Sequence, residues 1–330
     1  MAVQDTETDS RLGVDLGAGL TLKNPVMPAS GCFGPEMGTL FDLGQLGALV
    51  PKTIFYGERA GNPAPRTAES PAGMLNSIGI PSRGVEHFLT ELLPEYTKYD
   101  SPVIVSIGGL GIEEYDRLAE RLNGEPGVAG LEVNISCPNL EAGGMEIGAS
   151  PANVERVLRG VSDRFDGPVI AKLTPNITSI ADIAKASEQG GATAISAINT
   201  LSGMVIDVDN QRTVTGTMTG GVSGPAIRPI AVRMVWQVCS AVSLPVVGIG
   251  GITSAKDALE FILAGATAVA VGTANFTRPT TMLDVIEGLK TYVETHHLSS
   301  IDDVRGQLEE GMRVAIEPPR PATPVSGRAG

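Results

Sequence analysis

Two pairs of residues late in the sequence are of a type that binds phosphate groups. Gly250-Gly251 and Gly272-Thr273 each follow a short apolar run. Glycine leaves the backbone N–H groups unobstructed, so a phosphate can approach them closely. The pairs therefore indicate a phosphorylated cofactor or substrate, with tight turns as the alternative explanation. A dinucleotide fingerprint is not present, because Gly248-Ile-Gly250 lacks a third glycine three residues on, and no Gly-Lys-Ser/Thr sequence occurs.

Cys137 is the candidate base or nucleophile. It lies in Asn134-Ile-Ser-Cys-Pro-Asn139, directly after an apolar run and before a glycine-rich stretch. Nearby lysines would favour its thiolate form. The histidines at 87, 296 and 297 are far from the end of any apolar run. We interpret the other two cysteines, Cys32 and Cys239, as small buried apolar residues, which is the usual role of a lone cysteine.

Polar residues end each of the apolar runs that we interpret as strands. They are Ser30, Lys52-Thr53, Ser106, Asn134, Ser136-Cys137, Lys172, Asn199-Thr200, Gly250-Gly251 and Gly272-Thr273. Strand ends are often polar simply because they meet water. Two lysines and two asparagines at one rim are harder to explain in that way, so we expect a binding site there.

Eight apolar runs recur along the chain, and segments with helical periodicity separate most of them. The runs are 24–30, 48–54, 102–108, 130–136, 168–174, 194–200, 245–252 and 268–274. Several are apolar at consecutive positions, which is typical of parallel strands covered on both faces. This alternation predicts an α/β fold, a (β/α)8 TIM barrel, with a doubly wound open sheet as the alternative.

Helix start signals support this reading. Ser150-Pro151 predicts an N-cap followed by proline in the first turn, and apolar residues from Val154 to Phe165 mark one face. Ser179 with Asp182, and Ser254 with Asp257, have the spacing of a capping box. Gly190 and Gly265 are suited to end those two helices.

Three further features complete the predicted organisation. Residues 12–26 read as an N-terminal β-hairpin that caps the bottom of the barrel, and the long loops after the second and sixth strands are placed to cover a site. We divide the chain into a disordered acidic N-terminus at 1–11, a single catalytic domain at 12–317, and a disordered proline-rich tail at 318–330.

Composition restricts the class of protein. The chain has 330 residues, is 42% hydrophobic and has a net charge of −13, which disfavours nucleic acid as a partner. Residues 1–11 do not resemble a secretory signal, and the longest uncharged stretch, 234–255, is a poor membrane span. Three widely spaced cysteines indicate neither a disulfide framework nor a metal site. We expect a cytoplasmic protein.

Five motifs resemble those of the class 1 dihydroorotate dehydrogenases, type 1B catalytic subunit. They are Asn76-Ser-Ile-Gly-Ile80, Asn134-Ile-Ser-Cys-Pro-Asn139, Ala197-Ile-Asn-Thr-Leu-Ser-Gly203, Gly220-Gly-Val-Ser-Gly-Pro-Ala226 and Val247-Gly-Ile-Gly-Gly251. The resemblance extends over about residues 12–289. It implies an FMN-dependent barrel that oxidises (S)-dihydroorotate to orotate in pyrimidine biosynthesis. One departure is Ser82-Arg83, where the family usually has Asn-Pro.

The resemblance also implies roles for individual residues. FMN would be held by Ser30, Lys52, Thr53, Ser106, Asn134, Lys172, Ile198, Gly224, Gly250, Gly251, Gly272 and Thr273. Substrate would contact Lys52, Asn76, Ser77, Ile78, Gly79, Ile80, Asn134, Asn199 and Thr200. Cys137 would remove the C5 proton while hydride passes from C6 to flavin N5. Lys172 would stabilise the negative charge of reduced FMN, and Lys52 would balance the charge of orotate.

Enzymes of type 1B work with a partner subunit that carries FAD and a 2Fe-2S cluster and passes electrons to NAD. This chain lacks the cysteines for such a cluster, so the resemblance places FAD and the cluster on a partner. A homodimer is expected at the core of the complex. The alternatives are a type 1A-like homodimer that uses fumarate, another flavin barrel that acts on a pyrimidine, and a phosphate-binding scaffold without catalysis.

Overall fold

Seven parallel strands form the centre of the molecule. The computed structural model describes residues 9–136, 138–139 and 145–310. The strands, in spatial order, are β3 (Val26–Pro28), β19 (Ala268–Val271), β18 (Val246–Ile249), β13 (Ala194–Ala197), β12 (Val169–Leu173), β9 (Val128–Asn134) and β8 (Val103–Ile107). All residues of β8, β12, β13, β18 and β19 are buried, as expected for strands covered on both faces.

The run at 48–54 closes this sheet into a barrel, although it forms no regular strand. Leu49 pairs with Pro102 and Ile104 through two hydrogen bonds of 2.9 Å, and Ile54 pairs with Ser106 and Gly108 at 2.8 and 2.9 Å. On the other side, Gly47 N–H donates to the Val26 carbonyl at 2.8 Å. The segment therefore lies between β3 and β8 and takes the place of the second of the eight barrel strands, which we number as positions in chain order. The (β/α)8 barrel is confirmed.

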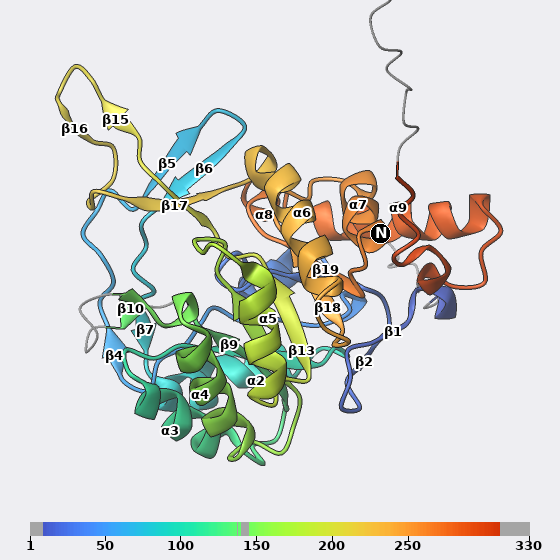
Figure 1. Ribbon diagram of the computed structural model, residues 1–330, viewed down its shortest axis with the longest axis horizontal. Coiled ribbons are helices and arrows are strands. Elements are labelled where there is room, and N and C mark those ends of the chain that lie inside the picture. The colour runs from blue at the N-terminus through green and yellow to red at the C-terminus, as the bar shows by residue number, and fades with distance from the viewer. Residues whose placement is uncertain (1–8, 137, 140–144, 311–330) are drawn as a thin grey trace, which may run out of the picture.

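Helices follow most of the strands and surround the barrel (Figure 1). In chain order they are α1 (Val85–His87), η4 (Phe88–Leu92), α2 (Leu93–Tyr96), α3 (Ile112–Leu122), α4 (Pro151–Ser162), α5 (Ile180–Gln189), α6 (Arg228–Cys239), α7 (Ala255–Leu263), α8 (Ala274–Thr277) and α9 (Thr281–Thr295). The helical turns are η1 (Ser10–Leu12), η2 (Pro35–Thr39), η3 (Leu43–Gln45), η5 (Ile147–Ala149), η6 (Pro225–Ile227) and η7 (Ile301–Val304). The turns η2 and η3 follow β3, where a regular barrel would have its first helix.

The predicted helix starts are confirmed, with one difference in chemistry. The Ser179 and Ser254 side chains accept hydrogen bonds from the backbone N–H groups of Asp182 and Asp257, at 3.4 and 3.3 Å. Ser150 occupies the N-cap of α4, but its side chain makes no capping hydrogen bond. Pro151 has no N–H and a φ suited to a first turn, so it favours the helix start without that bond.

The predicted N-terminal hairpin pairs β1 (Val14–Asp15) with β2 (Thr21–Leu22). Its turn lies under the barrel, because a Cβ on Gly17 would be 3.0 Å from the Thr193 carbonyl oxygen, just before β13. Gly17 has a φ of +83°, so glycine is favoured here by conformation as well as by space. The hairpin therefore covers the end of the barrel where strands begin, as the sequence predicts.

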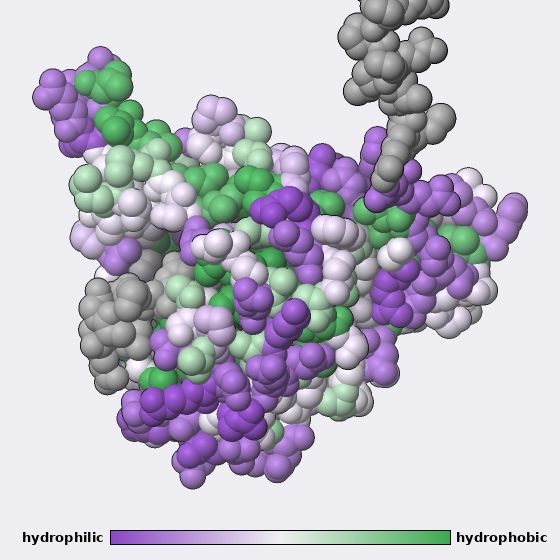
Figure 2. All heavy atoms as spheres, in the orientation of Figure 1, coloured by the Kyte–Doolittle hydropathy of each residue, from purple (hydrophilic) through white to green (hydrophobic). Residues whose placement is uncertain are grey.

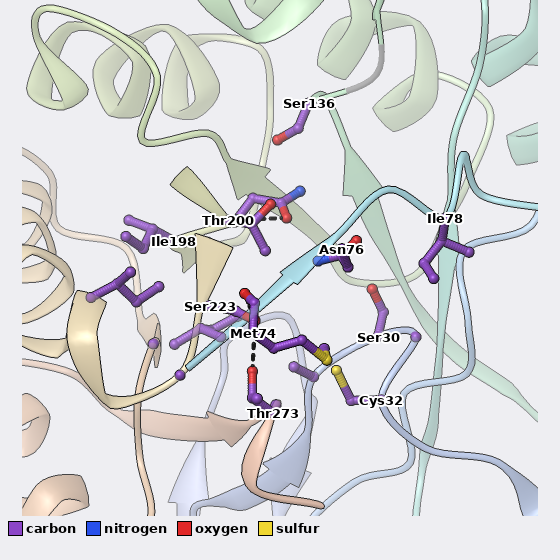
Figure 3. A pocket seen from close by; sticks show the side chains of 18 of the residues that line it. Ser30, Cys32, Met74, Asn76, Ile78, Ser136, Ile198, Thr200, Ser223 and Thr273 are labelled. Atoms are coloured by element: carbon purple, nitrogen blue, oxygen red, sulfur yellow. Dashed lines mark hydrogen bonds between the residues drawn. The ribbon is translucent and has the colours of Figure 1, made fainter. Parts of the chain in front are cut away.

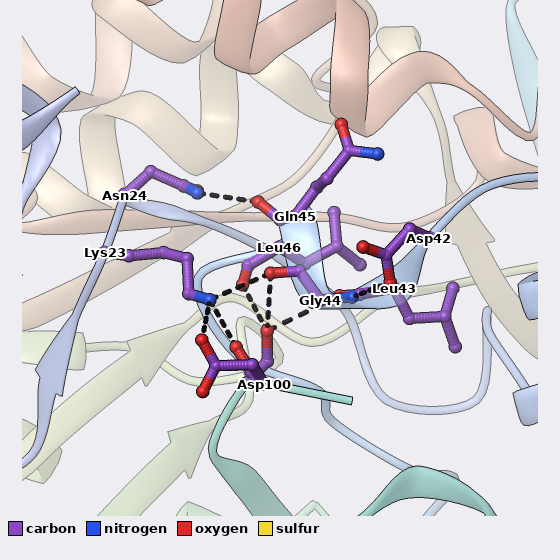
Figure 4. Close-up of polar contacts among 9 residues, drawn as sticks. Lys23, Asn24, Asp42, Leu43, Gly44, Gln45, Leu46 and Asp100 are labelled. Carbon is purple, nitrogen blue, oxygen red and sulfur yellow. Dashed lines mark hydrogen bonds and ion pairs between the residues drawn. The ribbon is translucent and has the colours of Figure 1, made fainter. Parts of the chain in front are cut away.

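A polar network fastens the irregular second position at the same end (Figure 4). The Asn24 side chain donates to the Gln45 carbonyl at 2.8 Å and accepts from the Val26 N–H at 3.1 Å. The Lys23 ammonium lies 3.0 Å from the Gly44 carbonyl and 3.0 Å from the Asp100 carboxylate. These contacts join the segments that enter the first three barrel positions.

The long loops after the second and sixth positions contain strands that the sequence analysis did not foresee. A four-stranded antiparallel sheet forms from β14 (Leu201–Gly203), β17 (Gly220–Ser223), β6 (Gly73–Asn76) and β5 (Thr67–Ser70). In the same two loops, two-stranded pairs form between β4 (Glu58–Arg59) and β7 (Ser82–Arg83), and between β15 (Ile206–Asp207) and β16 (Arg212–Thr213). A further pair, β10 (Pro138–Asn139) with β11 (Met145–Glu146), lies in the loop after β9, the fourth position. Short, glycine-rich strands give a weak sequence signal, which is why they read as loops.

The predicted terminal segments fall mostly outside the described residues, which exclude 1–8 and 311–330. Within the predicted N-terminal segment, Ser10–Leu12 forms η1, and Arg11 pairs with Asp9 and Glu294. No helix in the described part of the chain has the length and apolar character needed to span a membrane.

Replacing Asn24 by alanine tests the network at the barrel bottom. The change leaves the Gln45 carbonyl and the Val26 N–H without their present partner, and an unsatisfied buried group costs about 1–3 kcal/mol. We expect a loss of about 2 kcal/mol in the free energy of unfolding, measured by urea denaturation. The control is Lys98→Ala, which removes an exposed ion pair with Glu95 and should change stability by less than about 1 kcal/mol. Equal stability of the two variants would contradict this role.

Candidate active site

A cavity of about 690 Å³ opens where the barrel strands end. Its walls come from the ends of β3, β9, β12, β13, β18 and β19, from the segment at 47–54, and from the four-stranded sheet. A volume in this range is typical of sites for cofactors and small ligands. The cavity is therefore at the rim where barrel enzymes place their chemistry.

The structure brings most of the sequence-predicted site residues together at this cavity. Those lining it are Ser30, Lys52, Thr53, Asn76, Ile78, Ile80, Asn134, Lys172, Ile198, Asn199, Thr200, Gly224, Gly250, Gly251, Gly272 and Thr273. Of the predicted residues that the structure describes, three are not part of the lining. Ser106 is fully buried behind it, with its hydroxyl 2.8 Å from that of Thr53. The Ser77 hydroxyl accepts a hydrogen bond from the Asn62 amide, and the Gly79 carbonyl accepts one from the Arg59 guanidinium, both within the loop after the second position.

A chain of hydroxyl and amide groups forms the polar floor of the cavity. The Thr53 hydroxyl lies 3.5 Å from the Ser30 hydroxyl and accepts a hydrogen bond from the Asn134 amide at 3.5 Å. The Asn199 amide donates to Asn134 Oδ1 at 3.3 Å, and Asn199 Oδ1 accepts from the Thr200 N–H at 2.8 Å. These bonds fix which end of each amide faces a ligand, so donors and acceptors are presented in a defined pattern.

Two lysines give the cavity positive charge. Burial lowers the pKa of Lys52 from its ordinary value, the nearby Cys32 thiol opposes this shift, and Arg66 adds to it. A negatively charged ligand would offset the cost of holding this ammonium in a partly buried place. Lys172 is 5% exposed and lies 3.5 Å from the carboxylate of Glu132, which is also buried.

The glycines near the ends of β18 and β17 are required by the backbone itself. Gly250, Gly251 and Gly224 have φ values of +138°, +71° and +96°. A Cβ on Gly251 would lie 2.8 Å from the Gly224 carbonyl oxygen. Gly272 differs, because the atoms nearest to an added Cβ would be 3.7 Å away. Turn geometry thus explains the first three glycines, while all four bring uncovered backbone to the cavity wall.

Several residues of the lining were not predicted from the sequence. Among them are Cys32, Thr67, Met74, Asn176, Ser223 and Phe276. Ser136, one of the predicted polar strand ends, also lines the cavity. Figure 3 shows Cys32 and Met74 among the lining side chains, and the Thr273 hydroxyl donates to the Ser223 hydroxyl at 2.8 Å. Ser223 and Met74 come from β17 and β6, so their presence at the cavity follows from the sheet that the sequence did not reveal.

The cysteines and histidines are placed as follows. Cys32 lines the cavity and is not simply a core residue, and burial raises the pKa of its thiol to about 11. Cys239 packs against the core, and burial raises its pKa to about 12. Cys137, the predicted base, lies outside the described residues. No histidine of the described chain lines this cavity, and no group of three or more His, Cys, Asp or Glu side chains in that part could hold a metal ion.

Comparison with known proteins identifies the family. The model of the dihydroorotate dehydrogenase family matches residues 15–293. A protein of Desulforudis audaxviator named dihydroorotate dehydrogenase B (NAD(+)), catalytic subunit, is 54% identical over 291 residues, which are 88% of this chain and 95% of the relative. Proteins of the same name from Geotalea uraniireducens and Alkaliphilus oremlandii are 49% and 46% identical, over 88% and 91% of this chain and 96% and 100% of their own. The chain belongs to the dihydroorotate dehydrogenase family.

Proposed function

We propose that this chain is the catalytic subunit of an NAD-linked dihydroorotate dehydrogenase, which oxidises (S)-dihydroorotate to orotate with bound FMN in pyrimidine biosynthesis. The observation that carries the proposal is the convergence of Lys52, Lys172, Asn134 and Asn199 on one cavity at the barrel rim, in a member of this family. The names of its relatives support dihydroorotate as substrate and NAD as final acceptor.

The residues of the cavity fit FMN. Uncovered backbone at Gly250, Gly251 and Gly272 suits a phosphate, and Lys172 supplies a cation for the pyrimidine end of the flavin. The floor of Ser30, Thr53 and Asn134 offers hydroxyl and amide groups that can donate and accept hydrogen bonds. When bound, FMN supplies an acceptor for the hydride from C6 of the substrate.

The remaining chemistry belongs to the chain itself. Lys52 balances the carboxylate of the substrate, while Asn134 and Asn199, held by their mutual hydrogen bond, orient its ring amides. The loop with Asn76 and Ile78 closes the other side. We assign Cys137 as the base that takes the proton from C5, on the strength of its family motif and its place directly after β9.

We also propose that two copies of the chain associate and that a second subunit carries FAD and a 2Fe-2S cluster. Four exposed apolar residues gather on the segment around β15 and β16, which projects from the body (Figures 1 and 2): Met204, Ile206, Val208 and Met218. Such a patch favours a protein interface. A type 1A-like enzyme using fumarate remains the second candidate, since it would share the same site residues.

The first prediction from the proposed function concerns the cofactor. The purified chain should be yellow with one FMN per chain, and anaerobic dihydroorotate should bleach the flavin absorbance. Visible spectroscopy before and after substrate addition measures both. A protein that holds no flavin even after FMN is added would contradict the proposal, and a flavin that dihydroorotate leaves oxidised would favour a different substrate for the same barrel.

The second prediction concerns Cys137. Cys137→Ser should bind FMN and orotate normally but reduce the flavin at least 100-fold more slowly, because a hydroxyl is a far weaker base than a thiolate. The wild-type rate should rise with pH toward the ordinary thiol pKa of roughly 8.5. Stopped-flow bleaching measures the rate, with Cys239→Ser as the control that should react like wild type. An unchanged rate in Cys137→Ser would remove this thiol from the mechanism.

The third prediction concerns the electron acceptor. The isolated chain should be reduced by dihydroorotate yet turn over slowly with NAD, because its sequence has neither a dinucleotide fingerprint nor ligands for a cluster. Co-expression with a flavin and iron-sulfur subunit should restore NAD reduction and produce a larger complex on gel filtration. Rapid NAD turnover by the chain alone would exclude this division of labour. Rapid turnover with fumarate would favour the type 1A alternative.

A further inference from the structure

The buried carboxylate of Glu132 lies directly behind Lys172, one of the two lysines that line the cavity. Glu132 on β9 pairs in register with Ile170 on β12, two residues before Lys172 on the same strand. Side chains two residues apart on a strand lie on the same face of the sheet. Because both strands run toward the cavity, Glu132 lies one layer of side chains below Lys172, farther from the cavity. Lys172 lines the cavity and Glu132 does not. The ammonium therefore lies between the carboxylate and the space for a ligand.

The contacts of Glu132 place its carboxylate next to Lys172. Ser196 on β13, 1% exposed, donates to Glu132 Oε2 at 3.0 Å. The other oxygen, Oε1, makes no hydrogen bond within the described residues and lies 3.5 Å from Lys172 Nζ. Both side chains of the ion pair are less than 10% exposed. Burial of a carboxylate is costly unless it is paired, so Lys172 and Glu132 form one electrostatic unit.

We propose that Glu132 is a positioning residue that sets how strongly Lys172 stabilises the reduced cofactor; this inference rests on the FMN function proposed above. An ammonium alone in a buried site would strongly favour negative charge at the pyrimidine end of the flavin, because screening is weak there. The carboxylate behind it offsets part of that field. With both charges in place, Lys172 would still stabilise the reduced cofactor, but not so strongly that electron transfer to the next carrier becomes unfavourable.

Glu132→Gln tests this directly, because it keeps the size of the side chain and an oxygen that accepts from Ser196 while removing the charge. FMN should bind as in wild type. The equilibrium between oxidised and reduced flavin should shift at least tenfold toward the reduced form, a rise of about 30 mV for a two-electron couple. An anaerobic titration against reference dyes measures it. Sulfite, whose adduct leaves negative charge on the same end of the flavin, should bind more tightly.

Two further variants separate this role from a structural one. Ser196→Ala removes a hydrogen bond to Glu132 and keeps its charge, so the equilibrium should move less than threefold. If Glu132→Gln fails to retain FMN, Glu132→Asp, which withdraws the carboxylate from Lys172, should shift the equilibrium in the same direction by threefold or more.

The outcomes distinguish the two proposals. A wild-type protein without flavin contradicts the proposed function and leaves nothing for Glu132 to adjust. A yellow wild type, with an FMN-loaded Glu132→Gln whose reduction equilibrium is unchanged or shifted toward the oxidised form, overturns the role of Glu132 alone. So does a shift of similar size in Ser196→Ala, which would show that any disturbance of this layer has the same effect.

Discussion

Parallel strands that close into a barrel must all end at one rim, and the site depends on this constraint. It brings Ser30 from the first position and Thr273 from the last into the lining of one cavity. The second position meets the constraint with little regular pairing, since the described backbone bonds to the neighbouring strands come from Gly47, Leu49 and Ile54. It nevertheless carries Lys52 and Thr53, so the closure of the barrel also places a charge and a hydroxyl in the site.

The side chains inside the barrel become more polar toward the rim. Most inward side chains are aliphatic, but the layers near the rim contain Ser106, Glu132, Lys172 and Ser196, all at most 5% exposed. Groups of this kind are tolerated in a core only when they pair with one another. The bonds of Ser106 to Thr53 and of Ser196 to Glu132 provide that pairing. The polar layer behind the cavity floor is thus built into the barrel strands themselves.

The sequence was sufficient to predict the barrel, because consecutive apolar residues in β8, β12 and β18 and the caps at Ser179 and Ser254 are local signals. It was also sufficient to predict that the residues at the strand ends meet in one site. It could not predict that Ser106 lies behind Thr53, since a strand end gives no information on depth. Nor could it reveal Glu132 as a partner of Lys172, because a single charge within an apolar run says nothing of which side chain lies next to it on the neighbouring strand.

The cover of the cavity was the least predictable part, because it depends on pairing between distant segments. β6 belongs to the loop after the second position and β17 to the loop after the sixth, and they pair through Asn76, Leu75 and Met74 with residues 221–223. The Ser77 hydroxyl bonds to Thr217, and the Gly216 N–H donates to the Pro65 carbonyl at 2.7 Å. The predicted substrate loop is therefore held by the loop that follows Asn199 and Thr200. Because the two loops share one sheet and these hydrogen bonds, they form a single cover over the cavity.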